Sequence, residues 1–261
     1  MPASKVHTHP YFEGPFVALA HRGGALMAAN QGIENTLKAF QNAAELGYRW
    51  METDVHTTSD GVLIAFHDTH LDRVTDATGA VASLPWDVVL RARVGTEPIP
   101  RLDELLDAFP TMRFNIDIKA PGAVEPLARA IERHRAHDRV CVGSFSTQRL
   151  TAFRRRMGTR VATSVSPAGV LRHVAMPWTP PQWSGTGMAF QVPVSHDVRG
   201  HRIPVVTPSF IRRAHAQGRH VHVWTINDSH EMKRLIDMGV DGIVTDRPEV
   251  LKPILMSRGL W

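Results

Sequence analysis

Short apolar runs alternate with longer amphipathic stretches over most of this 261-residue chain. Repeated alternation of this kind is typical of a parallel sheet with helices packed outside it. We predict strands at residues 17–20, 50–55, 113–118, 140–143, 160–164, 188–192, 220–225 and 242–245. We predict helices at residues 36–46, 102–109, 124–137, 147–157, 208–217, 229–238 and 248–256.

The predicted elements fit a closed (β/α)8 barrel, the TIM barrel of the α/β class. An open doubly wound sheet is the alternative, but no GxGxxG motif opens any predicted strand-to-helix turn. We expect residues 1–261 to form one domain, with the barrel at about residues 15–257. Residues 68–101 show little periodicity, and we predict that they form a small insertion after the second strand, over the barrel mouth.

A second irregular segment, residues 177–187, contains Trp178 and Trp183. It precedes a predicted strand, so we expect it on the face opposite the mouth. We interpret it as a packed loop, and a docking patch for a membrane or a partner is the alternative. The sequence leaves peripheral membrane contact and the oligomeric state open.

Composition narrows the class of protein. Apolar residues make up 43% of the chain and charged residues 21%, as in ordinary globular proteins. No stretch reaches the length needed to span a bilayer, and residues 1–14 lack the apolar core of a signal peptide, so we expect a cytoplasmic location. Cys141 is the only cysteine and lies between Val140 and Val142, which predicts a buried, inert thiol and no disulfide.

The chain is basic, with a net charge of +5 and a pI near 9.9. The arginines are scattered apart from the run 154–156, which we interpret as a solvated helix face. No interleaving of basic and aromatic residues indicates a surface for stacking bases. We therefore predict no nucleic-acid partner.

Polar residues occupy one face of two predicted strands. Alternation places Glu52 and Asp54 on the same side of one strand, and Asn115, Asp117 and Lys119 on the same side of another. Since the opposite face of the second strand is apolar and must meet the helices, the charged face should point into the barrel. Buried charges cost several kcal/mol unless they are paired or bind a ligand. At the carboxyl ends of barrel strands, such a set indicates an active site.

Oxygen-only ligands favour a hard cation over zinc, so these carboxylates predict one divalent ion, Ca²⁺ or Mg²⁺. The alternative is a set of structural salt bridges from the carboxylates to Arg22 and Lys119.

Seven short motifs in a fixed order make the chain similar to the glycerophosphodiester phosphodiesterase family. They are His21-Arg22-Gly23-Gly24, Glu34-Asn35-Thr36, Glu52-Thr53-Asp54, His67-Asp68, the stretch 115–119, Trp224-Thr225-Ile226-Asn227 and the stretch 239–243. The resemblance implies metal-dependent hydrolysis of glycerophosphodiesters, small-molecule substrates, to sn-glycerol 3-phosphate and an alcohol. It also implies that Glu52, Asp54 and Asp117 are the metal ligands. The family commonly has glutamate where this chain has Asp117.

The resemblance assigns further roles. His21 and His67 are expected to be the proton-transfer pair, because imidazole titrates near neutral pH. The implied reaction passes through a cyclic phosphate. Arg22 and Lys119 are expected to hold the phosphate. The sequence does not decide which histidine is the base. We also expect Gly23-Gly24 to let the backbone approach the substrate.

Trp224 and Gln191 are the predicted substrate-binding residues. Trp224 follows His220 and His222 at a spacing of two, so it should wall the pocket with His222 beneath it, and a packed core tryptophan is the alternative. The stretch 195–202 is expected to be a mobile polar loop at the mouth, and recognition of the leaving alcohol is the alternative. Two other functions stay open: a lysophospholipase D acting on lysophospholipids, and a phosphate-binding barrel without turnover.

Overall fold

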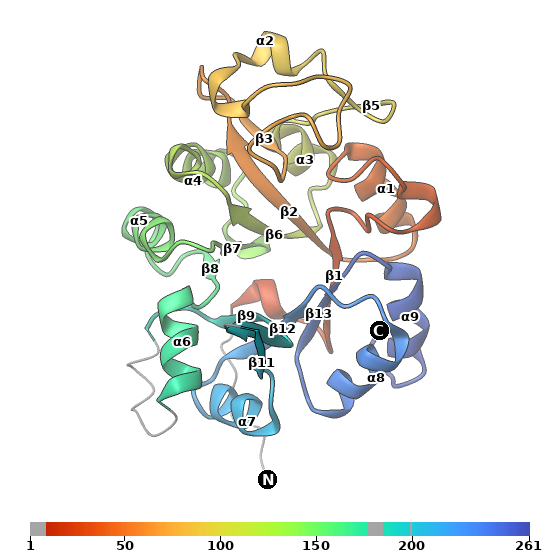
Figure 1. Ribbon diagram of the computed structural model, residues 1–261, viewed down its shortest axis with the longest axis vertical. Coiled ribbons are helices and arrows are strands. Elements are labelled where there is room, and N and C mark those ends of the chain that lie inside the picture. Colours follow the sequence, from red (N-terminus) through yellow and green to blue (C-terminus); the bar gives the residue numbers. More distant parts are fainter. Residues whose placement is uncertain (1–8, 177–184, 199) are drawn as a thin grey trace.

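The structure is a computed structural model that describes residues 9–176, 185–198 and 200–261. Within these residues, eight parallel strands surround a central axis and helices lie outside them (Figure 1). The strands follow one another around the barrel in chain order. They are β1 (Val17–His21), β2 (Trp50–Thr57), β6 (Arg113–Ile118), β7 (Val140–Gly143), β8 (Ala162–Thr163), β9 (Ala189–Pro193), β12 (His220–Trp224) and β13 (Gly242–Thr245).

The barrel closes at two places. β1 pairs with β13 in parallel, and a bridge between Ser164 and Ala189 joins the ends of β8 and β9. The Val165 amide also donates to the Ala189 carbonyl at 2.7 Å. The predicted (β/α)8 fold is therefore confirmed.

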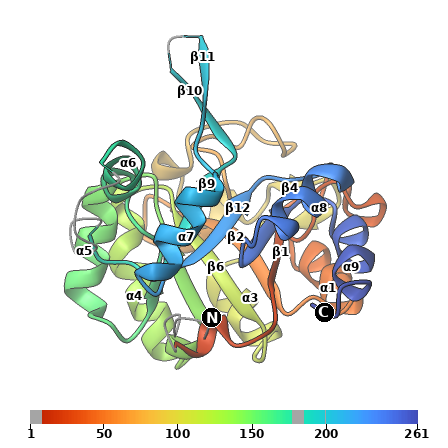
Figure 2. The ribbon, with the colours of Figure 1, turned by 90° about the horizontal axis from the view of Figure 1, so that it is seen from below.

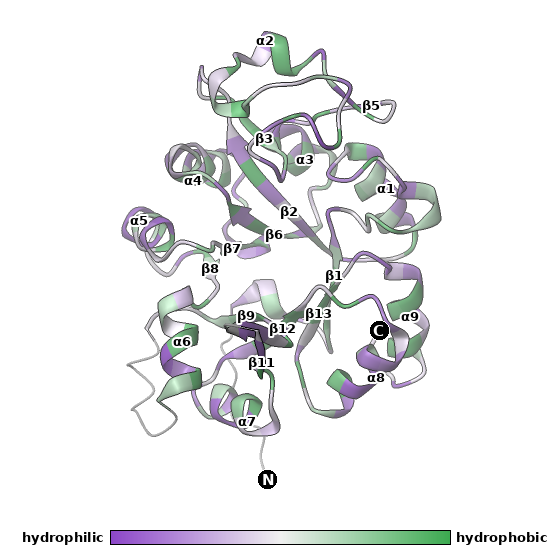
Figure 3. Ribbon diagram, in the orientation of Figure 1, coloured by the Kyte–Doolittle hydropathy of each residue, from purple (hydrophilic) through white to green (hydrophobic). Residues whose placement is uncertain are grey.

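Amphipathic helices cover the outside of the barrel. Figure 3 shows hydrophobic and hydrophilic residues together on helices such as α4 and α9, which pack one side on the strands. The helices are α1 (Leu37–Glu45), α3 (Leu102–Ala108), α4 (Val124–Arg133), α5 (Thr147–Met157), α6 (Pro167–Ala175), α7 (Pro208–Ala216), α8 (Ser229–Asp237) and α9 (Pro248–Met256).

Helix α6 was not predicted from the sequence, although its start signals are present. The Ser166 side chain accepts a hydrogen bond from the Gly169 amide, and Pro167 occupies the first turn. Leu171 on this helix is 67% exposed, so the apolar pattern of a buried helix is weak there. The signal is weak because the helix lies over the mouth, where Val170 and Val174 pack against the core but are only partly buried.

Strand alternation separates the apolar outer face of the barrel from an inner face that is polar near the carboxyl ends of the strands. Phe114, Ile116 and Ile118 on β6 are buried in the cluster beneath the helices. Asn115 and Asp117, on the other face, line an internal cavity, as predicted. In the β2–β6 register, Asp54 lies beside Asp117, which brings two of the predicted ligands to the same level of the barrel.

Aromatic residues close the amino-terminal end of the barrel. The short 3-10 helix η1 (Pro10–Phe12) places Tyr11 and Phe12 in the interior beside Trp50, whose indole nitrogen donates to the Tyr11 carbonyl at 2.9 Å. Phe12 stacks on His220 with ring centroids 4.2 Å apart. Cys141 is buried in the same cluster, as predicted, and burial raises the pKa of its thiol well above the usual value.

The segment between β2 and α3 forms a small unit beside the barrel. It contains β3 (Leu63–Ala65), which pairs antiparallel with β2, then η3 (Val81–Ser83), α2 (Trp86–Val89) and the pair β4 (Arg93–Val94) and β5 (Glu97–Pro98). Its apolar residues, among them Phe66, Leu71 and Val89, form a separate buried cluster. Figure 1 shows this insertion at one end of the molecule's long axis, at the rim of the barrel beyond α1 and α3.

A hairpin rises from the barrel after β9. It consists of β10 (Ser195–Val198) paired antiparallel with β11 (His201–Pro204), and Figure 2 shows it projecting beyond the helices. The predicted loop at 195–202 is instead a hairpin, in which the two strands satisfy each other's backbone groups. Residues 177–184, including Trp178 and Trp183, lie outside the described residues. Within the part that is described, no helix is both long enough and apolar enough to cross a bilayer.

Candidate active site

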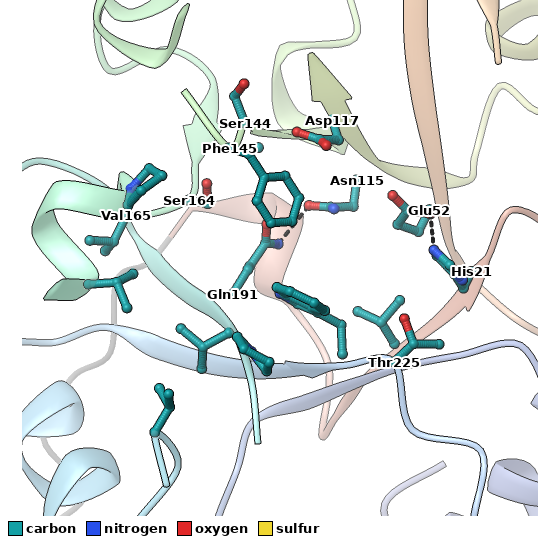
Figure 4. Close-up of a pocket in the computed structure, with 18 of the residues that line it drawn as sticks. His21, Glu52, Asn115, Asp117, Ser144, Phe145, Ser164, Val165, Gln191 and Thr225 are labelled. Atoms are coloured by element: carbon teal, nitrogen blue, oxygen red, sulfur yellow. Dashed lines mark hydrogen bonds and ion pairs between the residues drawn. The ribbon is translucent and has the colours of Figure 1, made fainter. Parts of the chain in front are cut away.

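A cavity of about 590 Å³ opens at the carboxyl ends of the barrel strands. All nine predicted site residues line it: His21, Arg22, Glu52, Asp54, His67, Asp117, Lys119, Gln191 and Trp224. In Figure 4, His21, Glu52 and Asp117 lie on one side of the pocket, and Val165 lies on the other. The fold thus brings together residues from six segments spread over some 200 positions.

His21 is held by a carboxylate from the last strand-to-helix turn. Its Nδ1 lies 2.6 Å from Asp246 Oδ1, and Asn227 donates to the other oxygen of Asp246 at 2.8 Å. Since an ionised carboxylate only accepts, Nδ1 carries the proton and Nε2 is left toward the cavity. Burial works against the charged ring, but Glu52 and Asp246 outweigh it and raise the pKa of His21.

His67 has a matching partner next to it in the sequence. Its Nδ1 donates to Asp68 Oδ1 at 2.5 Å, so Nε2 is again the nitrogen available for chemistry. Burial disfavours ionised Asp68, but hydrogen bonds from Arg73 and His67 outweigh this and lower its pKa to about 2. The two histidines therefore carry the same tautomer, each with a carboxylate behind it.

Two of the three predicted ligand carboxylates pair with one ammonium group. Lys119 Nζ is 2.9 Å from Asp54 Oδ1 and 2.6 Å from Asp117 Oδ2. Burial, together with the neighbouring Asp54 charge, raises the pKa of Glu52 to about 7. Within the described chain, no three His, Cys, Asp or Glu side chains are already arranged to hold a metal ion. Lys119 lies between two of the predicted ligand carboxylates.

The carboxylate cluster nevertheless contains a buried oxygen that accepts no hydrogen bond. Asp117 Oδ1 is buried and has no hydrogen-bond partner, and burial raises the pKa of this carboxyl. For Asp54, the charges of Lys119 and Arg22 outweigh burial and lower the pKa. A buried, oxygen-only cluster of this kind suits a hard cation in its donor chemistry.

The Glu34-Asn35-Thr36 motif supports Arg22. Arg22 Nη1 donates to Glu34 Oε1 at 2.9 Å, and Arg22 Nε lies 3.4 Å from Asp54 Oδ2. Asn35 adopts a left-handed backbone (φ 60°) and donates to Asp54 Oδ2 at 3.4 Å. Thr36 caps α1 by accepting from the Ala39 amide, as its position in the sequence predicts.

The adjacent glycines have a packing role in the turn after β1. A Cβ atom on Gly23 would lie 2.8 Å from Ala39 Cβ, and one on Gly24 would lie 2.6 Å from Pro248 Cγ. Both glycines also have positive φ, at 85° and 89°. They allow the turn after β1 to pack closely on α1 and α9, which aims His21 and Arg22.

Trp224 and Gln191 form another part of the wall. Gln191 Nε2 donates to Asn115 Oδ1 at 2.7 Å, and the buried His222 lies beneath, with Nδ1 3.5 Å from the same nitrogen. Burial lowers the pKa of His222 to about 3, so its ring is neutral. The Trp224 ring lines the cavity and meets Phe145 edge to face at 5.5 Å, and it also packs against the buried cluster that contains Trp50.

The side of the cavity opposite the carboxylates is apolar. It is formed by α6 and the hairpin together with parts of β9, through Val165, Pro167, Val170, Leu171, Val174, Val192, Ile203 and Val205. Phe145 (65% exposed) and Ile203 (42% exposed) continue this surface to the outside. Sequence reasoning missed Phe145, Asp246, Arg73 and the apolar wall, although the places of Phe145 and Asp246 after strand ends were a usable signal.

Comparison with known proteins agrees with the class of enzyme that this barrel and site define. The model of the "Glycerophosphoryl diester phosphodiesterase family" matches residues 21–250. The chain is 41% identical over 255 residues to the Mycobacterium tuberculosis protein named probable glycerophosphodiester phosphodiesterase 2, covering 95% of this chain and 97% of that one. A lysophospholipase D of Rattus norvegicus is 26% identical, over 91% of this chain and 85% of its own.

Solved structures share the fold. A phosphodiesterase of Oleispira antarctica, in complex with the product sn-glycerol-3-phosphate, has a TM-score of 0.76 at 21% identity and covers 92% of this chain and 96% of its own. A glycerophosphodiester phosphodiesterase of Agrobacterium tumefaciens has a TM-score of 0.74 at 21% identity, over 92% and 98% of the two chains.

The chain belongs to the glycerophosphoryl diester phosphodiesterase family. It is an enzyme of the phosphodiesterase class, as its motifs predict.

Proposed function

We propose that this protein hydrolyses glycerophosphodiesters to sn-glycerol 3-phosphate and an alcohol by acid–base catalysis between His21 and His67. The observation that carries the proposal is the pair of histidines, each with Nδ1 bound to a carboxylate, at one cavity with Arg22 and Lys119. The product complex of the Oleispira antarctica phosphodiesterase supports the choice of product.

The reaction has two steps, formation of a cyclic phosphate and its hydrolysis. One histidine takes the proton of the glycerol hydroxyl next to the ester as this oxygen attacks phosphorus, and the other protonates the departing alcohol. The resulting cyclic phosphate is opened by water with the roles of the histidines reversed. Arg22 and Lys119 bind the non-bridging oxygens, whose charge grows at the pentacoordinate phosphorus.

Glu52, Asp54 and Asp117 would hold one divalent cation, Ca²⁺ or Mg²⁺. The buried Asp117 Oδ1 without a hydrogen-bond partner and the raised pKa of Glu52 both support a cation site at this cluster. When bound, such a cation would lower the pKa of a coordinated hydroxyl and balance the charge at phosphorus. Asp117 is one methylene shorter than the glutamate common in the family, so its reach toward the cation differs. Activity with each of the two ions shows which one the site uses.

The test is release of sn-glycerol 3-phosphate from glycerophosphocholine with Ca²⁺, Mg²⁺ or a chelator, in the wild type, His21→Ala and His67→Ala. We expect metal-dependent turnover that both substitutions abolish. His230→Ala, an exposed histidine on α8, is the matched control and should retain full activity. Turnover that survives in either histidine variant contradicts the assigned pair. A protein that binds sn-glycerol 3-phosphate without any turnover is the non-catalytic barrel.

The apolar wall favours a second candidate substrate, a lysophospholipid. Glycerol and phosphate are polar, and the groups that suit them lie on the carboxylate side, so the apolar side has room for an acyl chain. The likeness to the Rattus norvegicus lysophospholipase D supports this reading. It would also bring the exposed Phe145 and Leu171 near a lipid surface.

Lysophosphatidylcholine in place of glycerophosphocholine decides between the substrates, with Leu171→Asp as the diagnostic variant. Because Leu171 is 67% exposed, the substitution should leave the fold intact. A lysophospholipase D should lose kcat/KM for the lysolipid and keep it for glycerophosphocholine. A kcat/KM for the lysolipid that Leu171→Asp leaves at the wild-type value would remove the acyl-chain role of the wall. The cytoplasmic location and the single-domain organisation stay predictions.

A further inference from the structure

Arg73, in the insertion, contacts two carboxylates that each hold a different part of the site. Its Nε donates to Asp68 Oδ2 at 2.5 Å, and its Nη2 donates to Glu34 Oε1 at 2.7 Å. Asp68 accepts from His67, and Glu34 accepts from Arg22. We call these five residues the rim network: Arg22, Glu34, Arg73, Asp68 and His67.

The rim network depends on the shape of a guanidinium group. A planar fork can bind two carboxylates from two edges, whereas an ammonium group is a single point charge. The Arg73 side chain is 48% exposed, while those of Glu34 and Asp68 are 17% and 22% exposed, so Arg73 covers both carboxylates from the solvent side. Burial works against ionised Glu34, but the hydrogen bond from Arg73 and the charge of Arg22 outweigh it and lower its pKa.

Glu34 is shared between two arginines. Its Oε1 accepts from both Arg22 and Arg73, and Oε2 lies 3.3 Å from Arg73 Nη1. Without Arg73, the whole charge of Glu34 would act on Arg22, and the two side chains would be free to form a bidentate pair. Such a pair competes directly with a phosphate for the same guanidinium donors.

The insertion gives Arg73 a firm base. Leu71, two residues earlier, is fully buried in the separate apolar cluster of the insertion, and its amide donates to the Gly79 carbonyl at 3.0 Å. The Thr75 hydroxyl, two residues after Arg73, donates to the Leu71 carbonyl at 2.9 Å. The turn that carries Arg73 is therefore fixed on both sides, independently of the barrel.

We propose that Arg73 is a positioning residue of the active site, which fixes Asp68 behind His67 and draws the charge of Glu34 away from Arg22. Arg22 is thereby kept available for phosphate. This role rests on the proposed function, since it acts through the phosphate-binding arginine and a proton-transferring histidine. It also gives the insertion a purpose in the reaction.

The experiment measures two quantities in Arg73→Ala and Arg73→Lys: kcat with glycerophosphocholine, and the calorimetric affinity for sn-glycerol 3-phosphate with the same cation present. Arg73→Ala should lower both by roughly 10-fold, the order of one charge-assisted hydrogen bond each. Arg73→Lys should recover at most one of the two losses. Arg91→Ala is the matched control, because this arginine of the same insertion is 81% exposed and makes only a 4.0 Å ion pair.

A second pair of variants separates positioning from simple damage to the insertion. Asp68→Asn should lower kcat without changing the affinity for sn-glycerol 3-phosphate. In the Arg73→Ala background, Glu34→Gln removes the competitor for Arg22, so the double variant should regain the affinity but not kcat. A distorted insertion has no reason to respond in this way.

Unchanged kcat and affinity in Arg73→Ala would overturn the inference, as would an affinity that Glu34→Gln fails to restore. The affinity measurement needs no turnover. If the wild type binds sn-glycerol 3-phosphate but releases no product, the proposed function fails while the role of Arg73 toward Arg22 is still tested.

Discussion

Replacing Asp246 by asparagine should impair His21 without removing any atom that fills space. Asp246 accepts two hydrogen bonds, from His21 Nδ1 at 2.6 Å and from Asn227 Nδ2 at 2.8 Å. An amide in its place can accept at one position only, and its NH₂ group must face the other donor. Either the contact with Asn227 is lost or the proton of His21 moves to Nε2, the nitrogen that faces the cavity.

The size of the effect follows from the burial of this contact. The side chains of His21 and Asp246 are only 17% and 16% exposed, so solvent screens the interaction little. A hydrogen bond to a charged group contributes about 1.5–3 kcal/mol. At about 1.4 kcal/mol per factor of ten, Asp246→Asn should reduce kcat by about 10- to 100-fold.

The assay combines kcat for glycerophosphocholine with an NMR measurement of the His21 tautomer through two-bond ¹⁵N–¹H couplings. Asp237→Asn on α8, where the aspartate is 66% exposed, is the control and should leave kcat unchanged. Full kcat in Asp246→Asn with the proton on Nε2 would refute the argument that this tautomer matters. Full kcat with the proton still on Nδ1 would show that the hydrogen bonds of Asp246 do not contribute to kcat.

Three further predictions concern stability. The folded pKa of Glu52, about 7, lies above its unfolded value, so in chelator the protein should lose stability as the pH rises from 4.5 to 7, and Glu52→Gln should flatten this loss. The hydrogen bond to Asp241 raises the pKa of His215, so its stabilisation is present below pH 6.5 and lost above the folded pKa. His215→Gln should therefore reduce the free energy of unfolding more at pH 5.5 than at pH 8.5, and an equal reduction at both would contradict the assignment. Phe153→Ala in the core should cost about 3–5 kcal/mol in denaturant unfolding. A loss under 1 kcal/mol would mean that neighbouring side chains had moved into the space left by the Phe153 ring.

Local patterns in the sequence were sufficient for the barrel and for the sides of its strands. On β6, the alternation of Phe114, Ile116 and Ile118 with Asn115 and Asp117 already required a charged interior, because only the apolar set can meet the helices. The helix predicted at 36–46 corresponds to α1, which Thr36 caps. Helix α6 escaped prediction because its apolar residues Val170 and Val174 lie between the cavity and the core and are only partly buried. The hairpin β10–β11 escaped prediction because its strands carry a polar, exposed sequence.

The sequence by itself thus determined the fold class, the family and nine of the residues that line the cavity. Only the tertiary structure decided which groups pair within it: Asp246 with His21 across 225 positions, Arg73 with Glu34 across 39, and Lys119 between Asp54 and Asp117. The reason is physical. Strand periodicity and helix capping are set by neighbours in the chain, whereas a buried charge takes its partner from whatever distant segment the fold places within hydrogen-bond distance.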